Sequence, residues 1–155
     1  MKPAAKKRAK RVPRKPIRTA RKPAKRVNAM VIIRRTGNEW ARHWNAGDLD
    51  NVVGAYASDA VYLPPHHQAV HGRDAIRRYL QGPLRHGVTG LAFDVTWIKQ
   101  EGNIAWDVGT YHMSVPQNDG TKMEDHGKYL TVWKRMGAKW LIIADAWSSD
   151  LPPSN

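Results

Sequence analysis

Residues 126–150 read HGKYLTVWKRMGAKWLIIADAWSSD, and this stretch indicates an antiparallel pair of strands. Two runs rich in β-branched and aromatic residues flank a short turn around Gly137. The second run, residues 140–147, is apolar on both faces apart from Asp145. A carboxylate inside an apolar strand is unfavourable by several kcal/mol unless it is paired, hydrogen-bonded or neutralised. Asp145 is therefore the first candidate for a functional residue.

The residues before this hairpin predict three helices and one short strand. Residues 31–46 place Ile33, Trp40, Ala41 and Trp44 on one helical face. Asp48 is suited to cap a second, short helix that turns Leu49, Val52, Val53 and Tyr56 inward. A short strand is expected at residues 60–63, and a third helix at residues 73–81, ended by Gly82 and Pro83.

From Leu91 onward the pattern is extended. Apolar residues alternate with polar ones, and turn signals occur at residues 102–103 and 118–120. The order is then helix, helix, short strand, helix and four long antiparallel strands. This order predicts an α+β fold with its helices on one side of a sheet.

Seven short motifs along the chain occur in the order found in one known superfamily. They are residues 47–50 (GDLD), 56–61 (YASDAV), 72–76 (GRDAI), 105–111 (AWDVGTY), 127–133 (GKYLTVW) and 145–147 (DAW), with the Tyr56-Ala57 and Asp59-Ala60-Val61 parts counted separately. Together they resemble the NTF2-like superfamily, and the last three resemble its SnoaL-like or ketosteroid-isomerase-like branch, of the SgcJ-like kind. The resemblance covers about residues 30–152. It implies a cystatin-like cone, in which a curved antiparallel sheet and three N-terminal helices enclose a pocket.

The positive charge of the chain is concentrated at its N-terminus. Residues 1–28 contain seven lysines, six arginines and no acid, so the formal net charge of +13 belongs to this segment and the remainder is neutral. Four prolines and the self-repulsion of like charges oppose a helix there. We expect residues 1–29 to be a disordered basic tail and residues 30–152 to form one domain.

A basic tail of this kind is suited to nonspecific attachment to nucleic acid or another polyanion, through phosphate neutralisation and counterion release. The residues expected to make these contacts are Lys6, Lys7, Arg8, Lys10, Arg11, Arg14 and Lys15. Two alternatives stay open: a solvated tail with no partner, and an extension upstream of a start at Met30.

Other classes of site are disfavoured by composition. The chain has no cysteine, so neither a disulfide nor a thiolate site can form, and a cytoplasmic location is expected. No apolar run approaches the length of a membrane span. His66, His67 and His71 do not match the ligand spacing of zinc sites, so we expect neither a metal nor a cofactor, and we expect loop histidines at a pocket rim.

The strand register decides which residues share a face with Asp145. Alternation puts Ile143, Asp145 and Trp147 on one face of the last strand. A three-residue loop at residues 137–139 puts Tyr129, Thr131 and Trp133 on that same face, and a two-residue loop puts them on the other. By the resemblance, the face of Asp145 is the pocket face. Asp107 and Tyr111 share a face of their own strand, and the sequence leaves open which one.

Asp145 is the candidate catalytic residue, because a desolvated carboxylate suits general acid/base work. The alternative is a structural aspartate that accepts a hydrogen bond from a tyrosine or tryptophan. The residues expected to bind a ligand are mainly aromatic: Trp40, Trp44, Tyr56, Tyr62, His66, Tyr79, Tyr129, Thr131, Trp133 and Trp147.

The resemblance also argues against one familiar activity. The steroid isomerases of the superfamily use an aspartate base, with a tyrosine and a protonated aspartate as donors. Carried over by position, these fall at Pro64, Trp40 and Thr131, so all three are replaced. Classical ketosteroid isomerisation is not expected.

Two hypotheses about function follow. The first is a pocket protein that binds a small apolar cyclic ligand, as an isomerase or hydrolase-like acid/base enzyme or as a binder. The second is a non-catalytic dimeric scaffold whose basic tails bind nucleic acid or another polyanion. In both, we expect a homodimer through the outer sheet face, because the strand at residues 140–147 is apolar on both faces.

Overall fold

A computed structural model describes residues 28–152 of the chain. The predictions about the basic tail, including Lys6 to Lys15 and their binding to nucleic acid, concern residues outside this range. The elements follow in the order α1 (Ala29–Asn45), α2 (Leu49–Gly54), β1 (Tyr56–Leu63), β2 (Val70–His71), α3 (Arg73–Arg85), β3 (Thr89–Glu101), β4 (Ile104–Pro116), β5 (Lys122–Met136) and β6 (Lys139–Ser149).

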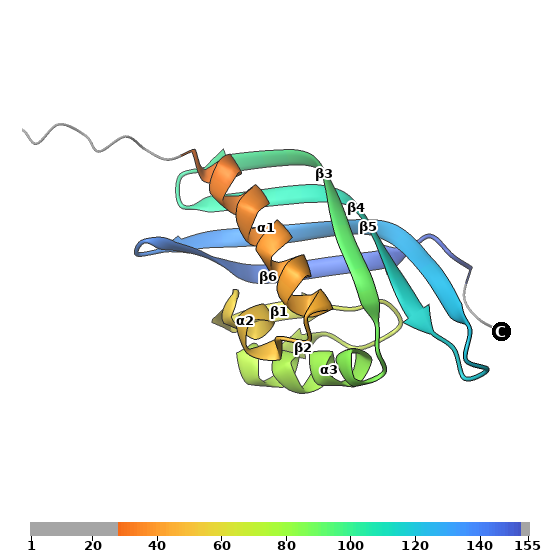
Figure 1. The fold of residues 1–155 in the computed structure, drawn as a ribbon. Coiled ribbons are helices and arrows are strands. Elements are labelled where there is room, and N and C mark those ends of the chain that lie inside the picture. Colours follow the sequence, from red (N-terminus) through yellow and green to blue (C-terminus); the bar gives the residue numbers. More distant parts are fainter. Residues whose placement is uncertain (1–27, 153–155) are drawn as a thin grey trace, which may run out of the picture.

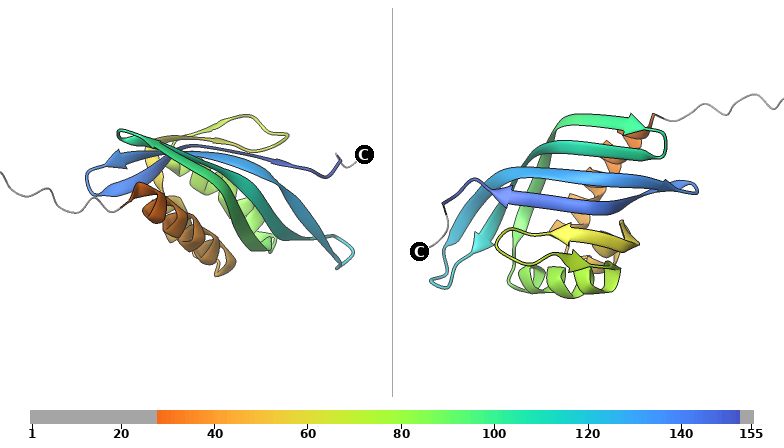
Figure 2. Two further views of the ribbon diagram at one scale, coloured as in Figure 1. Left: turned by 90° about the horizontal axis from the view of Figure 1, so that it is seen from above. Right: turned by 180° about the vertical axis from the view of Figure 1, so that it is seen from behind.

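The strands form one curved sheet in the order β2-β1-β6-β5-β4-β3, and the helices lie on its concave side (Figures 1 and 2). This confirms the expected α+β cone. One detail of the prediction was wrong: β1 pairs with β6 in parallel, so the sheet is mixed. The other neighbouring strands pair antiparallel. Because β1 and β6 come from opposite ends of the domain, local sequence patterns could not reveal their relative direction.

The first two helices begin as the sequence predicts. The side chain of Asn28 accepts a hydrogen bond from the Met30 amide at the start of α1, and Asp48 accepts one from the Asn51 amide at the start of α2. Gly47 lies between the two helices with φ +73°, a conformation that favours glycine. Buried Ile33 and Trp44 hold α1 against the sheet. The result is a helix that covers the concave face along its length.

Three element boundaries differ from the prediction. β1 begins at Tyr56, because this residue pairs with Ile142 of β6 and does not continue α2. α3 passes through Pro83 and ends at Arg85. A proline this close to the helix end removes one backbone donor, and the turn still closes through the His86 amide and the Gly82 carbonyl. The segment expected to be a histidine loop contains the short strand β2, which pairs with β1.

The β5–β6 hairpin combines a two-residue turn with a bulge. Met136 pairs with Lys139 across the turn, so the loop is the shorter of the two possibilities. Farther along, Val132 pairs with Ala144 and Trp133 with Ile142, which leaves Ile143 as an extra residue in β6. The bulge reverses the effect of the short turn, so Tyr129 and Thr131 share a face with Asp145. It also moves Ile143 off that face, contrary to expectation, and Ile142 takes its place.

No helix among residues 28–152 covers the outer face of the sheet (Figure 2), and the strand register places a continuous apolar row on it. Cross-strand pairing joins Leu63, Ala146, Leu130, Val108 and Trp97 across five strands. Of these, Trp97 is 48% exposed, Leu130 43% and Leu63 42%. A second row lies beside it and consists of Val61, Ala144, Val132 and Trp106. Contiguous apolar surface of this kind marks an interaction site more often than a free surface.

We propose that this face joins two copies of the chain. The charged variant Leu130→Glu is then expected to shift the protein from dimer to monomer, because a carboxylate in the middle of the apolar row would lose water without gaining a partner. Sedimentation equilibrium at micromolar concentration measures the shift. Val31→Glu is the control, because Val31 is 61% exposed on α1 and lies away from the outer face. A wild-type protein that is already monomeric at this concentration would contradict the proposal.

Candidate functional site

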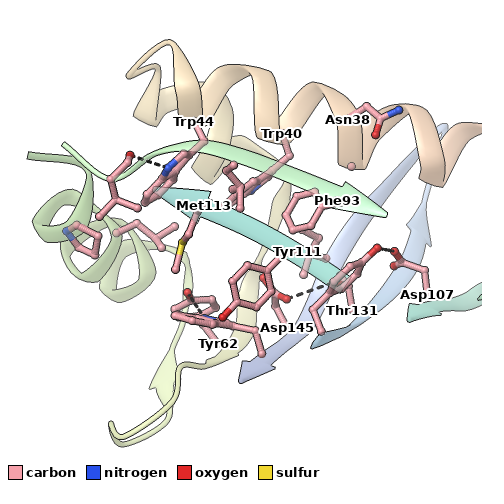
Figure 3. A pocket seen from close by; sticks show the side chains of 18 of the residues that line it. Asn38, Trp40, Trp44, Tyr62, Phe93, Asp107, Tyr111, Met113, Thr131 and Asp145 are labelled. Atoms are coloured by element: carbon pink, nitrogen blue, oxygen red, sulfur yellow. Dashed lines mark hydrogen bonds between the residues drawn. The ribbon is translucent and has the colours of Figure 1, made fainter. Parts of the chain in front are cut away.

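A pocket of about 350 Å³ lies between α1 and the concave face of the sheet. Trp40 and Trp44 of α1 line one side of it, and Asp145 and Thr131 lie on the opposite side (Figure 3). Tyr79 and Leu80 of α3 close one end. Its volume is within the range of natural small-molecule sites.

Asp145 is held in the pocket wall by hydroxyl groups on both of its oxygens. The Tyr56 hydroxyl donates to Oδ2 at 2.7 Å, and the Thr131 hydroxyl donates to Oδ1 at 3.2 Å. The donors come from β1 and β5, the two strands that flank β6. The carboxyl group is therefore fixed in orientation, while one side of it lines the pocket.

The surroundings of Asp145 make it easier to protonate. Burial raises the pKa of its carboxyl group from 3.8 to about 6, against the opposing effect of the hydrogen bonds from Tyr56 and Thr131, and the charge of Asp107 raises it further. Asp145 thus changes between its acid and base forms near pH 6, well above the range of a free aspartate. That property suits a group that both takes up and releases a proton.

Two more aspartates, Asp107 and Asp125, lie on the concave face. Asp107 is next to Tyr129, and Asp125 is next to Tyr111. The Tyr129 hydroxyl donates to Asp107 Oδ2 at 3.0 Å, and Trp133 Nε1 donates to Asp107 Oδ1 at 2.6 Å. Burial raises the pKa of Asp107, and these two hydrogen bonds oppose the rise. The Tyr111 hydroxyl donates to Asp125 Oδ2 at 3.2 Å.

These contacts come from a motif that occurs twice. Residues 107–111 read DVGTY and residues 125–129 read DHGKY, both of the form Asp-x-Gly-x-Tyr. In the antiparallel β4–β5 pair, Gly109 lies opposite Tyr129 and Gly127 lies opposite Tyr111. Each tyrosine ring crosses the glycine of the other strand and reaches the aspartate two residues before it. The two halves are related by an approximate two-fold axis.

The glycines are required by this arrangement. A Cβ atom at Gly109 would lie 2.3 Å from the Asp94 carbonyl oxygen and 2.8 Å from the ring of Tyr129, and one at Gly127 would lie 2.0 Å from the Ser148 carbonyl oxygen. Aromatic rings over glycines in neighbouring strands also protect backbone that would otherwise be bare.

The opposite wall is aromatic. Trp40 and Trp44, one helical turn apart, stack with ring centroids 5.6 Å apart and planes 8° from parallel. Trp44 Nε1 donates to the Val88 carbonyl at 3.0 Å, and this hydrogen bond fixes the orientation of the Trp44 ring. Trp40 Nε1 is buried and finds no acceptor among residues 28–152. Phe93 continues this wall, with its ring 6.0 Å from Trp40 and 5.0 Å from Tyr129.

The structure brings most of the predicted site residues together. Those that line the pocket are Trp40, Trp44, Tyr62, Tyr79, Tyr129, Thr131, Trp133, Asp145 and Trp147. Tyr56 does not line it, but supports Asp145 from behind. His66 does not reach it: this residue is exposed, with φ 55°, in the loop between β1 and β2. Of the three positions that correspond to the steroid isomerase residues, Trp40 and Thr131 line the pocket and Pro64 does not.

Asp107, Tyr111 and Asp125 were not among the predicted site residues. The sequence did not show whether Asp107 and Tyr111 lie on the pocket face or the outer face, because a strand pattern does not reveal which side of the sheet is concave. The repeated Asp-x-Gly-x-Tyr motif was the available signal. A motif that carries a carboxylate and a hydroxyl at the same spacing on two paired strands places both groups on one face.

The described residues offer neither a metal site nor a membrane-spanning helix. Among residues 28–152, no three histidine or carboxylate side chains are arranged to hold a metal ion. His67 instead packs edge-on against Tyr79, with centroids 5.0 Å apart. Of the helices formed by the described part of the chain, none has the length and apolar character needed to cross a membrane. The cytoplasmic location stays a prediction.

The fold and the enclosed pocket define the class of protein, an NTF2-like α+β cone. The sequence profile of the SnoaL-like domain matches residues 38–141, more than half of the chain. The chain therefore belongs to the SnoaL-like domain family, as the motifs indicated. A search of the curated proteins finds no match.

Solved structures agree on the fold. A ketosteroid isomerase-like protein from Erwinia carotovora atroseptica superposes with a TM-score of 0.73 at 15% identity, covering 81% of this chain and 99% of that one. An NTF2-like superfamily protein from Salmonella enterica gives 0.68 at 14% identity, covering 80% and 92%. An NTF2-like protein of unknown function from Pseudomonas putida gives 0.66 at 16% identity, covering 81% and 96%. At these identities the likeness shows the fold alone.

The contact between Gly109 and Tyr129 yields a prediction about stability. Gly109→Ala is expected to lower the free energy of unfolding by about 1–3 kcal/mol, because the new methyl group must displace both a backbone carbonyl and the ring of Tyr129. Denaturant melts followed by tryptophan fluorescence measure this change. Gly82→Ala is the matched control, since its Cβ meets nothing within 4 Å and lies in α3, where alanine is the better helix former. Equal stability of Gly109→Ala and the wild type would contradict the close packing of β4 and β5.

Proposed function

We propose that this protein is an acid/base enzyme acting on a small, mainly apolar cyclic ligand enclosed in the pocket. Asp145 is the group that transfers the proton. The observation that carries the proposal is the setting of this side chain: it lines the pocket, is oriented by Tyr56 and Thr131, and has a pKa raised to about 6. A structural aspartate with no chemical role has no need of access to the pocket.

The pocket also offers a donor for a ligand oxygen. Trp147 Nε1 donates to the Tyr62 hydroxyl oxygen at 2.7 Å, so that oxygen acts as an acceptor and its proton is directed elsewhere. Tyr62 lines the pocket on β1, where its Cα pairs with that of Asp145. Its pKa is raised well above 10, mainly by burial, so the hydroxyl stays neutral and keeps its proton.

These groups suit a reaction in which a proton moves within the ligand. Asp145 as a carboxylate takes a proton from a carbon next to a carbonyl, Tyr62 donates to the carbonyl oxygen as negative charge develops there, and Asp145 returns the proton at another position. The result is an isomerisation. Pro64, Trp40 and Thr131 replace the three catalytic residues of the steroid isomerases. The proposed isomerisation therefore uses different catalytic residues within a similar fold.

The proposal is tested with Asp145→Asn. A thermal-shift screen of small cyclic ketones first identifies a ligand, since a binder raises the melting temperature with its occupancy. With a compound that is turned over, the variant is expected to lose activity by a factor of about 10² or more, as for removal of a general acid or base. If the carboxylate is the active form, the wild-type rate falls as pH drops through about 6.

Stability separates a chemical from a structural role. The pKa of Asp145 is higher in the folded protein than in the unfolded chain, so the wild type loses stability as pH rises from about 4 to above 6. Asp145→Asn does not ionise, and its amide can still accept from Tyr56 and donate to Thr131. The variant is therefore expected to be as stable as the wild type at pH 7, or more so. A clear loss of stability at pH 7 with ligand binding intact would contradict the catalytic role.

The charge distribution supports a second, independent role for residues 1–28. With thirteen basic residues and no acid in this segment, we propose attachment to nucleic acid or another polyanion, presented twice by the dimer. This role does not depend on the pocket. It is the alternative to catalysis if no ligand is found.

The attachment is expected to be lost on deletion of residues 1–28. Full-length protein should bind duplex DNA with an affinity that falls about 10³–10⁵-fold between 50 and 200 mM salt if 6–10 phosphates are contacted. The shortened protein should show no binding, and its melting temperature should fall only through loss of the Asn28 cap of α1, since residues 29–152 contain the hydrophobic core. Fluorescence anisotropy with labelled DNA measures the binding of both proteins, and a thermal melt gives their melting temperatures. A DNA affinity that does not change with salt concentration, or that is unchanged by the deletion, would refute this role.

A further inference from the structure

The pocket has an unusual balance of charge. Its lining includes three aspartates, Asp107, Asp125 and Asp145, from three different strands. Among residues 28–152, the lining includes no lysine, arginine or histidine. The ion pairs found among residues 28–152 involve Glu39, Asp48, Asp50 and Asp150, and none involves the pocket aspartates.

Neutral donors satisfy these aspartates. Asp145 accepts from two hydroxyl groups, Asp107 from a hydroxyl and an indole, and Asp125 from Tyr111 and from the Ser149 hydroxyl at 2.5 Å. In the described part of the chain, Arg34 on α1 is the one cation whose charge reaches Asp107. It is exposed, and its effect on the pKa of Asp107 is weaker than that of burial or of the hydrogen bonds. The negative charge inside the pocket therefore has no matching positive charge from its own walls.

The rest of the lining favours a cation as well. Aromatic rings approach from several directions: Trp40 and Trp44 from α1, Tyr62 from β1, Phe93 from β3, Tyr111 from β4 and Trp147 from β6. The face of an aromatic ring carries negative charge and attracts a cation placed over it. A cation that enters this pocket exchanges water for ring faces and carboxylates. An anion would meet three carboxylates and, among the described lining residues, no positively charged side chain.

We infer that the ligand of this pocket is an organic cation, with an apolar cyclic body that bears a protonated amine or a quaternary ammonium group. The ring faces hold the apolar body, and the pocket aspartates supply the opposite charge. This inference rests on the proposed function in that it uses the same pocket and Asp145. It goes beyond the proposed function by assigning a positive charge to the substrate, because the acid/base chemistry alone does not determine that charge.

The inference is tested with three meta-substituted phenols, of which the cation and the neutral compound have nearly the same shape and the third is an anion. They are (3-hydroxyphenyl)trimethylammonium, its neutral isostere 3-tert-butylphenol, and the anion 3-hydroxybenzoate. Each is titrated into the full-length wild-type protein at pH 7, and binding is followed by quenching of tryptophan fluorescence and by calorimetry. The cation is expected to bind at least about tenfold more tightly than the neutral isostere, and the anion most weakly.

Two further measurements show whether the pocket aspartates cause the preference. Between pH 4.5 and 7.5 the affinity for the cation should rise as Asp145 ionises through about pH 6, and the affinity for 3-tert-butylphenol should stay level. The groups around Asp145 that titrate are Asp107 on β4, Tyr56 and Tyr62 on β1, and Tyr129 on β5. The pKa of each tyrosine is raised above 10, so these stay neutral over this range. Asp145→Asn should reduce cation binding about tenfold and leave the neutral probe unchanged.

The outcomes are distinct. Three results would each overturn the inference. The neutral or anionic probe could bind as tightly as the cation, no probe could bind at millimolar concentration, or the affinity for the cation could be the same at every pH. If the cation binds selectively but Asp145→Asn does not affect turnover of any amine, the ligand class stands and the proposed acid/base role fails. If a neutral ketone is turned over with dependence on Asp145 while the cation binds no better than its isostere, the proposed function stands and the ligand class fails.

Discussion

The concave face of this sheet must satisfy three carboxylates without a cation from its own walls, and this constraint ties the domain together. Each aspartate accepts from two neutral donors on other strands. Tyr56 joins β1 to β6 through Asp145, Thr131 joins β5 to β6 through the same group, and Tyr111 joins β4 to β5 through Asp125. A buried polar group left without a partner is costly. The hydrogen bonds that keep the carboxylates in the pocket therefore also fix how four strands lie against one another.

The repeated Asp-x-Gly-x-Tyr motif shows how little sequence is needed to build such a wall. In an antiparallel pair, residues two apart lie on one face, and a motif on one strand meets its copy running in the opposite direction. Glycine at the centre leaves room for the ring that crosses from the neighbouring strand, and the tyrosine hydroxyl then reaches the aspartate beyond it. Asp107 and Asp125 become nearly closed off, at 5% and 6% exposure. Their position is specified by the motif itself.

The sequence was sufficient for the fold class, the helices and most of the pocket residues, because these depend on hydrophobic alternation and helix caps that are local. It was insufficient for the register of β5 and β6. There, a two-residue turn alone would have turned Tyr129 and Thr131 away from Asp145, and a bulge at Ile143 corrects this. A bulge within an apolar run leaves no mark in the hydrophobic pattern, since every residue from Trp140 to Ala144 is apolar. The parallel pairing of β1 with β6 was hidden for a similar reason, because it joins segments about 80 residues apart.

The three aspartates differ in access, and this difference assigns their roles. Asp107 and Asp125 lie under tyrosine rings, so they contribute charge to the pocket without direct contact being required. Asp145 lies two residues beyond the bulge at Ile143, pairs with Thr131, and keeps one side toward the pocket. Its two hydroxyl donors hold it in place, while burial raises the pKa of the carboxyl group to about 6, so that it holds its proton more tightly than a free aspartate does. The charge of Asp107 raises the pKa of Asp145, so a cation in the pocket would lower it by opposing that charge. Binding of a positively charged ligand would thereby extend the carboxylate form of Asp145, the form required of a base, to lower pH.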